Sequence, residues 1–82
     1  MIGESHSLSN EFPKHKDDIS KLYEKDLNFA NQANQYNELD EKIRSLEMDN
    51  SPISDTDIRQ LKYDRSVLKD VLYKRILDFA TN

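Results

Sequence analysis

The amino-acid sequence predicts an all-α protein, an antiparallel helical hairpin of the coiled-coil type preceded by a short N-terminal helical segment. Two stretches, residues 22–47 and 58–79, carry apolar residues at the alternating three- and four-residue spacing of a helix seam. The turn signal Asn50-Ser51-Pro52 separates them, since asparagine tolerates a left-handed helix end and proline disfavours helix at the residue before it. Two helices joined by so short a connector pack antiparallel.

The elements are expected to follow one another within a single small domain. Residues 1–12 lack apolar periodicity, and we expect a mobile N-terminal tail there. Asp26-Leu27-Asn28 interrupts the helical pattern, and we expect a kink or brief break because Asp and Asn compete for backbone hydrogen bonds and cap new helices. The remainder, residues 13–82, is predicted to be one helical-hairpin domain with a short helix over about 14–25, a long helix over about 28–49, a connector at 50–54 and a second long helix over about 55–79.

The two helix seams contain charged residues of opposite sign. Acidic residues, among them Asp26 and Asp40, interrupt the first seam, whereas Arg65 and Arg75 interrupt the second. The antiparallel register that aligns the apolar residues brings Asp40 opposite Arg65. We therefore expect an Asp40–Arg65 ion pair that fixes the register of the hairpin, as polar seam residues do in coiled coils. The alternative is that both side chains point to solvent, where ion pairs are common and weak.

The C-terminal half of the second long helix is apolar on more than one side. A single partner helix covers one stripe, so the surplus faces either a folded-back N-terminal segment around residues 19–23 or another protomer. The residues expected to form this candidate interaction face lie at the open end of the hairpin: Phe29, Ala30, Ala33, Tyr36, Val67, Val71, Tyr73, Ile76, Leu77 and Phe79.

The composition favours self-association. Hydrophobic residues are 35% of the 82 residues and charged residues 34%, against about 45–50% and about 25% in ordinary globular proteins. A small helical scaffold with a thin core usually needs a further stabiliser. The chain has no cysteine from which a disulfide could form, so we expect a homo-oligomer, a small helical bundle.

A pattern of short motifs runs through most of the chain. It begins at Glu11-Phe12-Pro13, and its most specific parts are Leu39-Asp40-x-x-Ile43, Leu61-Lys62 and Leu68-Lys69-Asp70. Over roughly residues 8–76 this pattern resembles the YdcH-like family, small bacterial proteins classed as a domain of unknown function. The resemblance implies a cytoplasmic bacterial protein made as a helical hairpin, and it implies no activity and no catalytic or binding residues. Family members often have proline before the position of Phe29, which this chain lacks.

No reaction can be read from the residues. His15 and Asp18 share a helical face, yet two ligands do not make a specific metal site. Nucleophilic catalysis needs a nucleophile, a base and an orienting group held in a cleft, and a two-helix rod offers no cleft. We therefore expect no enzyme activity, no metal, no cofactor and no small-molecule substrate.

Charge and hydropathy bear on the remaining kinds of partner. The net charge is −4, and basic residues alternate with aspartates, which opposes a nucleic-acid footprint. The apolar residues 67–80 beside Lys74 and Arg75 favour membrane-surface binding only slightly more. No apolar run approaches the ~18 residues that span a bilayer, and the N-terminus lacks the pattern of a secretory signal. With no cysteine, these features fit a cytoplasmic location.

The sequence thus favours a non-enzymatic structural or protein-interaction module that acts through helix-face packing and self-association. Another protein is a second kind of partner that an apolar helix face could bind. The alternative is an accessory factor that associates with nucleic acid or with the membrane surface. Salt-sensitive binding to DNA or anionic vesicles distinguishes the two classes.

Overall fold

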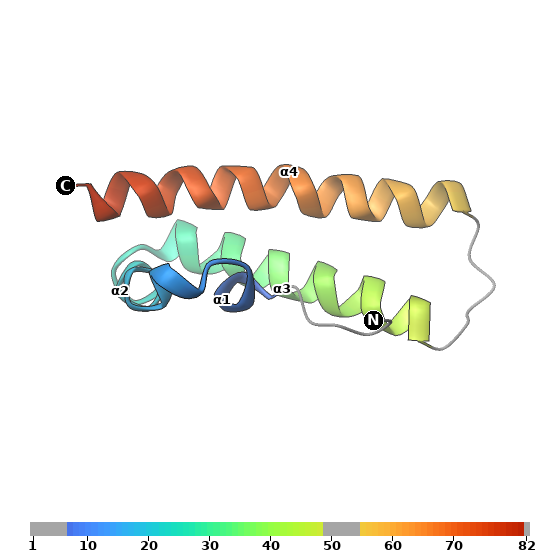
Figure 1. Ribbon diagram of the computed structural model, residues 1–82, viewed down its shortest axis with the longest axis horizontal. Coiled ribbons are helices and arrows are strands. Elements are labelled where there is room, and N and C mark those ends of the chain that lie inside the picture. Colours follow the sequence, from blue (N-terminus) through green and yellow to red (C-terminus); the bar gives the residue numbers. More distant parts are fainter. Residues whose placement is uncertain (1–6, 49–54, 82) are drawn as a thin grey trace.

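The computed structural model describes residues 7–48 and 55–81, and within these ranges every element is helical and no strand occurs (Figure 1). The expected connector at residues 50–54 lies outside the described residues. The prediction of an all-α helical hairpin is confirmed. In chain order the elements are α1 (Leu8–Glu11), the 3-10 turn η1 (Pro13–His15), α2 (Lys16–Lys25), α3 (Leu27–Met48) and α4 (Asp55–Ala80).

The hairpin consists of α3 and α4, which lie side by side and run antiparallel along the long axis of the molecule (Figure 1). The 26 residues of α4 make a rod of about 39 Å at 1.5 Å per residue. The molecule measures 45 × 20 × 17 Å, so α4 alone nearly spans it. The shorter elements α1, η1 and α2 gather at the end that holds the C-terminus (Figure 1).

The break between α2 and α3 falls on one residue, Asp26. Its backbone is extended (φ −126°, ψ 107°), and its side-chain Oδ1 accepts a hydrogen bond from the backbone N–H of Phe29 at 3.0 Å. Its carbonyl oxygen accepts the N–H of Ala30 at 2.9 Å. These are the bonds of an aspartate at a helix N-cap, where a side-chain oxygen satisfies one of the first free amides of the helix. The expected break is therefore a helix start.

The N-terminal segment folds back onto the hairpin and adds a third helical layer at the end that holds the C-terminus. Ile19 and Leu22 of α2 are buried, as is Leu8 of α1. The buried residues of this core cluster come from four helices: Leu8, Ile19, Leu22, Phe29, Ala33, Tyr36, Leu72 and Ile76, with Phe12, Leu68 and Phe79 packed against them.

The expectation of a mobile tail over residues 1–12 is wrong for residues 8–11. These residues form α1, and Leu8 is only 2% exposed. The backbone N–H of Leu8 donates a hydrogen bond to Asn37 Oδ1 of α3 at 3.2 Å, and Lys69 of α4 pairs with Glu11 at 3.5 Å. A four-residue helix has too few turns to show apolar periodicity. The sequence pattern therefore could not predict the burial of Leu8 or the two polar contacts that hold this segment.

Candidate interaction surface

Five residues of the expected interaction face are buried inside the molecule instead. Four of them belong to the core cluster that Leu8 of α1 and Ile19 and Leu22 of α2 complete. The folded-back N-terminal segment, one of the two covers that the sequence left open, therefore lies against this end of the hairpin. Two further residues, Leu77 and Phe79, are half-buried. The five buried residues are Phe29, Ala30, Ala33, Tyr36 and Ile76.

The other three expected residues, Val67, Val71 and Tyr73, are exposed on α4, at 46%, 40% and 38%. Val67 and Val71 line an open groove together with Asp70, Tyr73 and Lys74.

Tyr63 extends this apolar strip by one turn, since residues four apart lie above one another on a helix. It is 65% exposed. We call Tyr63, Val67, Asp70, Val71 and Lys74 the α4 face. Tyr63 is not among the residues of the expected interaction face, because the stretch of α4 that is apolar on several sides begins only at Val67.

A buried polar contact crosses the hairpin seam near its middle. Arg65 Nη1 donates a hydrogen bond to Asp40 Oδ1 at 2.9 Å, and the two side chains are 19% and 3% exposed. The structure therefore brings together the two residues that the sequence analysis paired, in the seam and away from bulk solvent. A fixed pair at this level opposes sliding of one helix along the other, because a shift separates the buried carboxylate from its cation.

Tyr36 lies one turn before Asp40 on α3 and is fully buried. Burial raises the pKa of its hydroxyl to about 12, and the negative charges of Glu11 and Asp40 act in the same direction, while Arg65 opposes them. The phenol thus stays neutral over the physiological range. Nothing in this arrangement prepares Tyr36 to give up a proton.

A second ion pair joins the helix break to α4. Arg75 Nη2 contacts Asp26 Oδ2, and Arg75 Nη1 donates to Gln32 Oε1 at 3.3 Å. The Phe29 amide bonded to Asp26 lowers the pKa of that carboxyl, and Arg75 lowers it further. Both residues are charged residues at seam positions of the sequence. An Asp26–Arg75 pair was not predicted, because Asp26 lies before α3 and outside the register that aligns α3 with α4.

An aromatic cluster attaches η1 to α4. The rings of Phe12 and Tyr73 stack with centroids 4.7 Å apart, and His15 meets Tyr73 edge-on at 6.3 Å. His15 Nδ1 lies 3.2 Å from Asp18 Oδ2. Within the described ranges no group of three or more His, Cys, Asp or Glu residues is placed to hold a metal ion. We therefore interpret this cluster as packing that holds the N-terminal segment in place.

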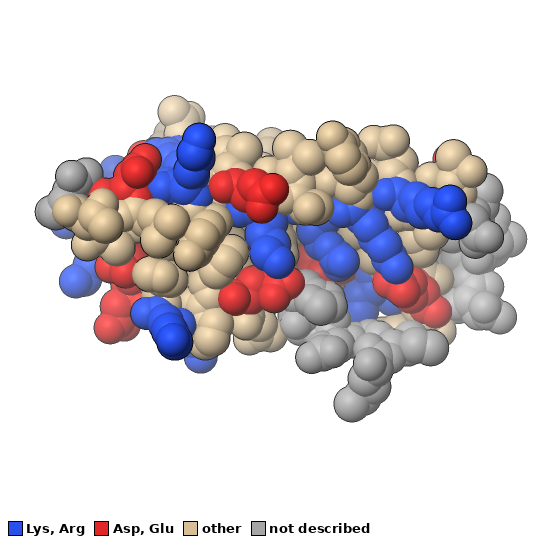
Figure 2. All heavy atoms as spheres, turned by 45° about the horizontal axis from the view of Figure 1, so that its top comes forward, with Lys and Arg blue, Asp and Glu red and all other residues tan. Residues whose placement is uncertain are grey.

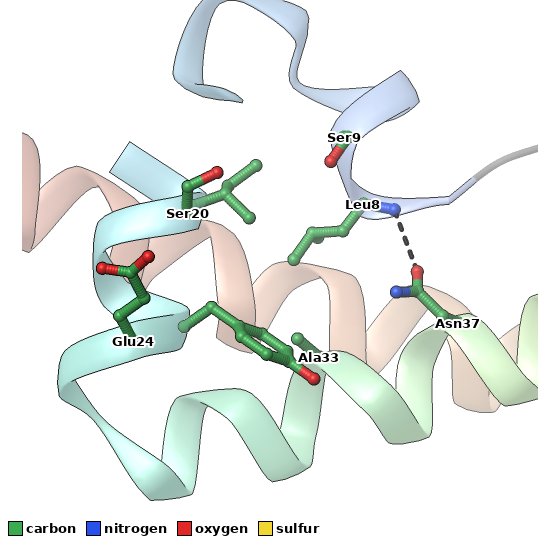
Figure 3. A pocket seen from close by; sticks show the side chains of 8 residues that line it. Leu8, Ser9, Ser20, Glu24, Ala33 and Asn37 are labelled. Atoms are coloured by element: carbon green, nitrogen blue, oxygen red, sulfur yellow. Dashed lines mark hydrogen bonds between the residues drawn. The ribbon is translucent and has the colours of Figure 1, made fainter. Parts of the chain in front are cut away.

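A pocket of about 300 Å³ opens between α1, α2 and α3. Leu8 and Ala33 reach into it, and Figure 3 shows Ser9 of α1 opposite Ser20 and Glu24 of α2, with the Leu8–Asn37 hydrogen bond at one side. Its lining contains no histidine or lysine, and Glu24 is its one carboxylate.

The surface carries both signs of charge. Figure 2 shows Lys and Arg side chains beside Asp and Glu side chains across the face that α4 presents. Among the helices that the structure describes, none combines the length and the apolar character needed to cross a membrane.

Comparison with known proteins places the hairpin in a family. A family model described as "Protein of unknown function (DUF465)" matches residues 29–76, which is more than half of the chain. The chain belongs to the DUF465 family. YdcH-like proteins are in this family, so the resemblance seen in the sequence is confirmed. No curated protein and no solved structure matches the chain.

The DUF465 segment coincides with the hairpin core. It begins at Phe29 and ends at Ile76, both fully buried, and it contains the Asp40–Arg65 pair and the whole α4 face. It leaves out α1, η1 and α2, which cover one end of the hairpin. The DUF465 description names no activity and no binding residues, so functional inference depends on the surface itself.

Proposed function

We propose that this DUF465 protein is a non-enzymatic protein-interaction module that binds a partner protein against the α4 face. One observation carries the proposal: Tyr63, Val67 and Val71 lie on one side of α4 with 40–65% of their surface exposed, while the apolar residues on the opposite side of the helix are packed into the core. An exposed apolar strip rimmed by charges is typical of a protein-binding surface.

The strip has the form that a helix partner recognises. Apolar side chains four residues apart on a helix pack into a groove or against another helix of a partner. Tyr63, Val67 and Val71 are three such side chains in succession. Asp70 and Lys74 line the same groove. Charged residues at the rim of an apolar contact favour one orientation of the partner over others.

The other function classes have less support in the described residues. The pocket in Figure 3 has neither histidine nor lysine among its lining residues, and the described residues hold no group of three or more His, Cys, Asp or Glu placed for a metal ion. On α4 the basic residues Lys69 and Lys74 stand next to Asp70, which opposes the continuous positive surface that nucleic acids and anionic membranes require.

A matched pair of variants tests the proposal. The double variant Val67→Asp/Val71→Asp places two charges in the strip without touching the core, and Leu27→Asp changes a residue that is 76% exposed at the start of α3. Both variants should keep the helical content of the natural chain in circular dichroism, because neither replaces a buried residue.

Capture from extracts of the source cells provides the readout. We expect the natural chain and Leu27→Asp to retain the same protein, and the double variant to lose it. If all three chains retain the same proteins, the α4 face is not the binding surface and the proposal fails. Salt-sensitive binding to DNA or to anionic vesicles, unchanged in the double variant, would instead assign the protein to the nucleic-acid- or membrane-associated class.

A further inference from the structure

We propose that the partner of the α4 face is a second copy of the same chain, packed antiparallel about a two-fold axis that passes midway between Val67 and Val71. This inference rests on the proposed function, since it names the protein that the face binds. In this arrangement Val67 of one copy faces Val71 of the other, and Asp64 of one copy faces Lys74 of the other.

The order of residues along the outer side of α4 carries the inference. The stripe at alternating four- and three-residue spacing is Gln60, Asp64, Val67, Val71, Lys74 and Asp78, and all six residues are exposed. This is the spacing that a helix buries against an antiparallel partner helix. The stripe has two apolar residues at its centre, Asp64 and Lys74 beside them, and Gln60 and Asp78 outside.

The inner four residues of the stripe are symmetric in polarity and opposite in charge about its centre. A two-fold contact brings residue i against residue j and residue j against residue i. With the axis between Val67 and Val71, the contact buries two Val67–Val71 pairs and forms two Asp64–Lys74 pairs. Tyr63, next to Asp64, lies where the aliphatic stem of Lys74 from the second copy covers its ring.

Charge distinguishes this register from its competitors. A parallel dimer sets Asp64 against Asp64 and Lys74 against Lys74, with no gain in apolar contact. An antiparallel dimer shifted by one turn sets Val67 against Val67 and Tyr63 against Val71, but it brings Asp64 against Asp70 of the second copy. Like charges placed opposite each other across a contact are strongly disfavoured, so the first register is preferred over both.

The six stripe residues are exposed in the folded chain. Figure 1 shows α1, α2 and α3 together on one side of α4. Asp64 accepts a hydrogen bond from Gln60 at 2.9 Å through Oδ1, which leaves Oδ2 to face Lys74 of the second copy. One helix face is a small interface, so we expect a reversible dimer that forms as the concentration rises.

Charge reversal on separate chains tests the register. In a Lys74→Asp chain two acidic residues face each other twice in the homodimer, and in an Asp64→Lys chain two basic residues do so. We expect each variant alone to dimerise about tenfold more weakly than the natural chain, or weaker still. Mixed in equal amounts, they restore both ion pairs, and sedimentation equilibrium should show a heterodimer as tight as the natural dimer.

Disulfide trapping tests the same register independently. The chain has no cysteine, so single substitutions report one position each, and a disulfide requires Cα atoms within about 7 Å. We expect mixed Val67→Cys and Val71→Cys chains to form the mixed disulfide in excess of random pairing. Leu27→Cys, which is exposed on α3, serves as the control and should give only background cross-linking.

Each outcome decides the inference. Restored heterodimers together with the mixed disulfide support it. A chain that stays monomeric at all concentrations overturns it, and a dimer trapped mainly through Val67→Cys with itself overturns the register. If the chain is monomeric yet the Val67→Asp/Val71→Asp variant still loses a captured protein, the proposed function holds with a different partner, so the two failures are distinguishable.

Discussion

Asp40 is the buried charged residue of the described chain, at 2% exposure, and its contact with Arg65 sets the chemistry of the hairpin seam. Removing both charges from water costs free energy that their attraction returns only in part, so the pair contributes little net stability. Separating the two costs more, because the buried carboxylate then loses the cation that offsets its removal from water. The pair therefore acts mainly against alternative registers.

The first prediction concerns the coupling between these two residues. We expect the double-mutant cycle of Asp40→Asn and Arg65→Gln to give a coupling free energy of about 1 kcal/mol or more, because the contact is 2.9 Å long and mostly buried. Urea unfolding of the four proteins measures it. The Glu47–Lys62 contact, 3.4 Å long and 38% and 44% exposed, is the control and should give about 0.5 kcal/mol or less. Equal couplings for both pairs would contradict the assignment.

The second prediction concerns alkaline pH. The pKa of Tyr36 is raised to about 12 in the folded chain, whereas an unfolded tyrosine has a pKa near 10. The folded state holds this proton more tightly, so the stabilisation is complete below about pH 10 and is lost as the pH rises towards about 12. Urea unfolding across this window should show the natural chain losing about 2 kcal/mol more than Tyr36→Phe. Parallel curves for the two proteins would show that Tyr36 is not responsible.

At the scale of the elements, the ends of the helices decide how the N-terminal third is placed. Asp26 closes α2, caps α3 and contacts Arg75 of α4, so one side chain fixes the break and attaches it to the hairpin. The aromatic stack of Phe12 on Tyr73 attaches η1 to the same helix. The covering layer is thus held by contacts at its turns as well as by the buried faces of α1 and α2.

The third prediction tests whether α1 is part of the folded core. Leu8 is 2% exposed, and a buried Leu→Ala change costs about 2–5 kcal/mol where the site cannot collapse. A short terminal helix can detach instead, so we expect Leu8→Ala to lower stability by about 1–2 kcal/mol. Amide exchange should increase at residues 8–12. Leu27→Ala, at an exposed position, is the control and should change stability by about 0.5 kcal/mol or less. If the Leu8→Ala protein is as stable as the control, α1 is not part of the folded core.

These elements differ in how far the sequence could predict them. The hairpin follows from periodicity, because α3 and α4 are long enough for a seam to repeat, and the charge faults Asp40 and Arg65 are meaningful only within such a repeat. The burial of Leu8 and the Asp26–Arg75 pair depend on how a short segment folds back, which no local pattern encodes. The sequence shows that the C-terminal half of α4 is apolar on more than one side. Which of these apolar residues are covered by the N-terminal segment and which stay exposed depends on the tertiary structure.

At the scale of the molecule, the two ends of the hairpin have unequal cores. The end with α1 and α2 buries a cluster drawn from four helices, including Phe29, Leu72 and Ile76. Towards the other end the described core is only two helices thick, with Ile43 fully buried and Leu46, Ile58 and Leu61 half-buried. Apolar burial is the main source of stability, so stability should decline along the rod.

The last prediction follows from this gradient. Native-state hydrogen exchange should be slowest at residues 29–40 and 68–76, which pack in the thick core, and faster at residues 44–48 and 58–61, because the thin end opens without unfolding the rest. We expect protection to differ by at least about tenfold, equivalent to about 1.4 kcal/mol. The measurement belongs at low protein concentration, where dimerisation through α4 is negligible, and repetition at high concentration should add protection on α4 alone. Uniform protection along both helices would mean that the hairpin opens as one cooperative unit, and that the layer formed by α1 and α2 gives its end no additional stability.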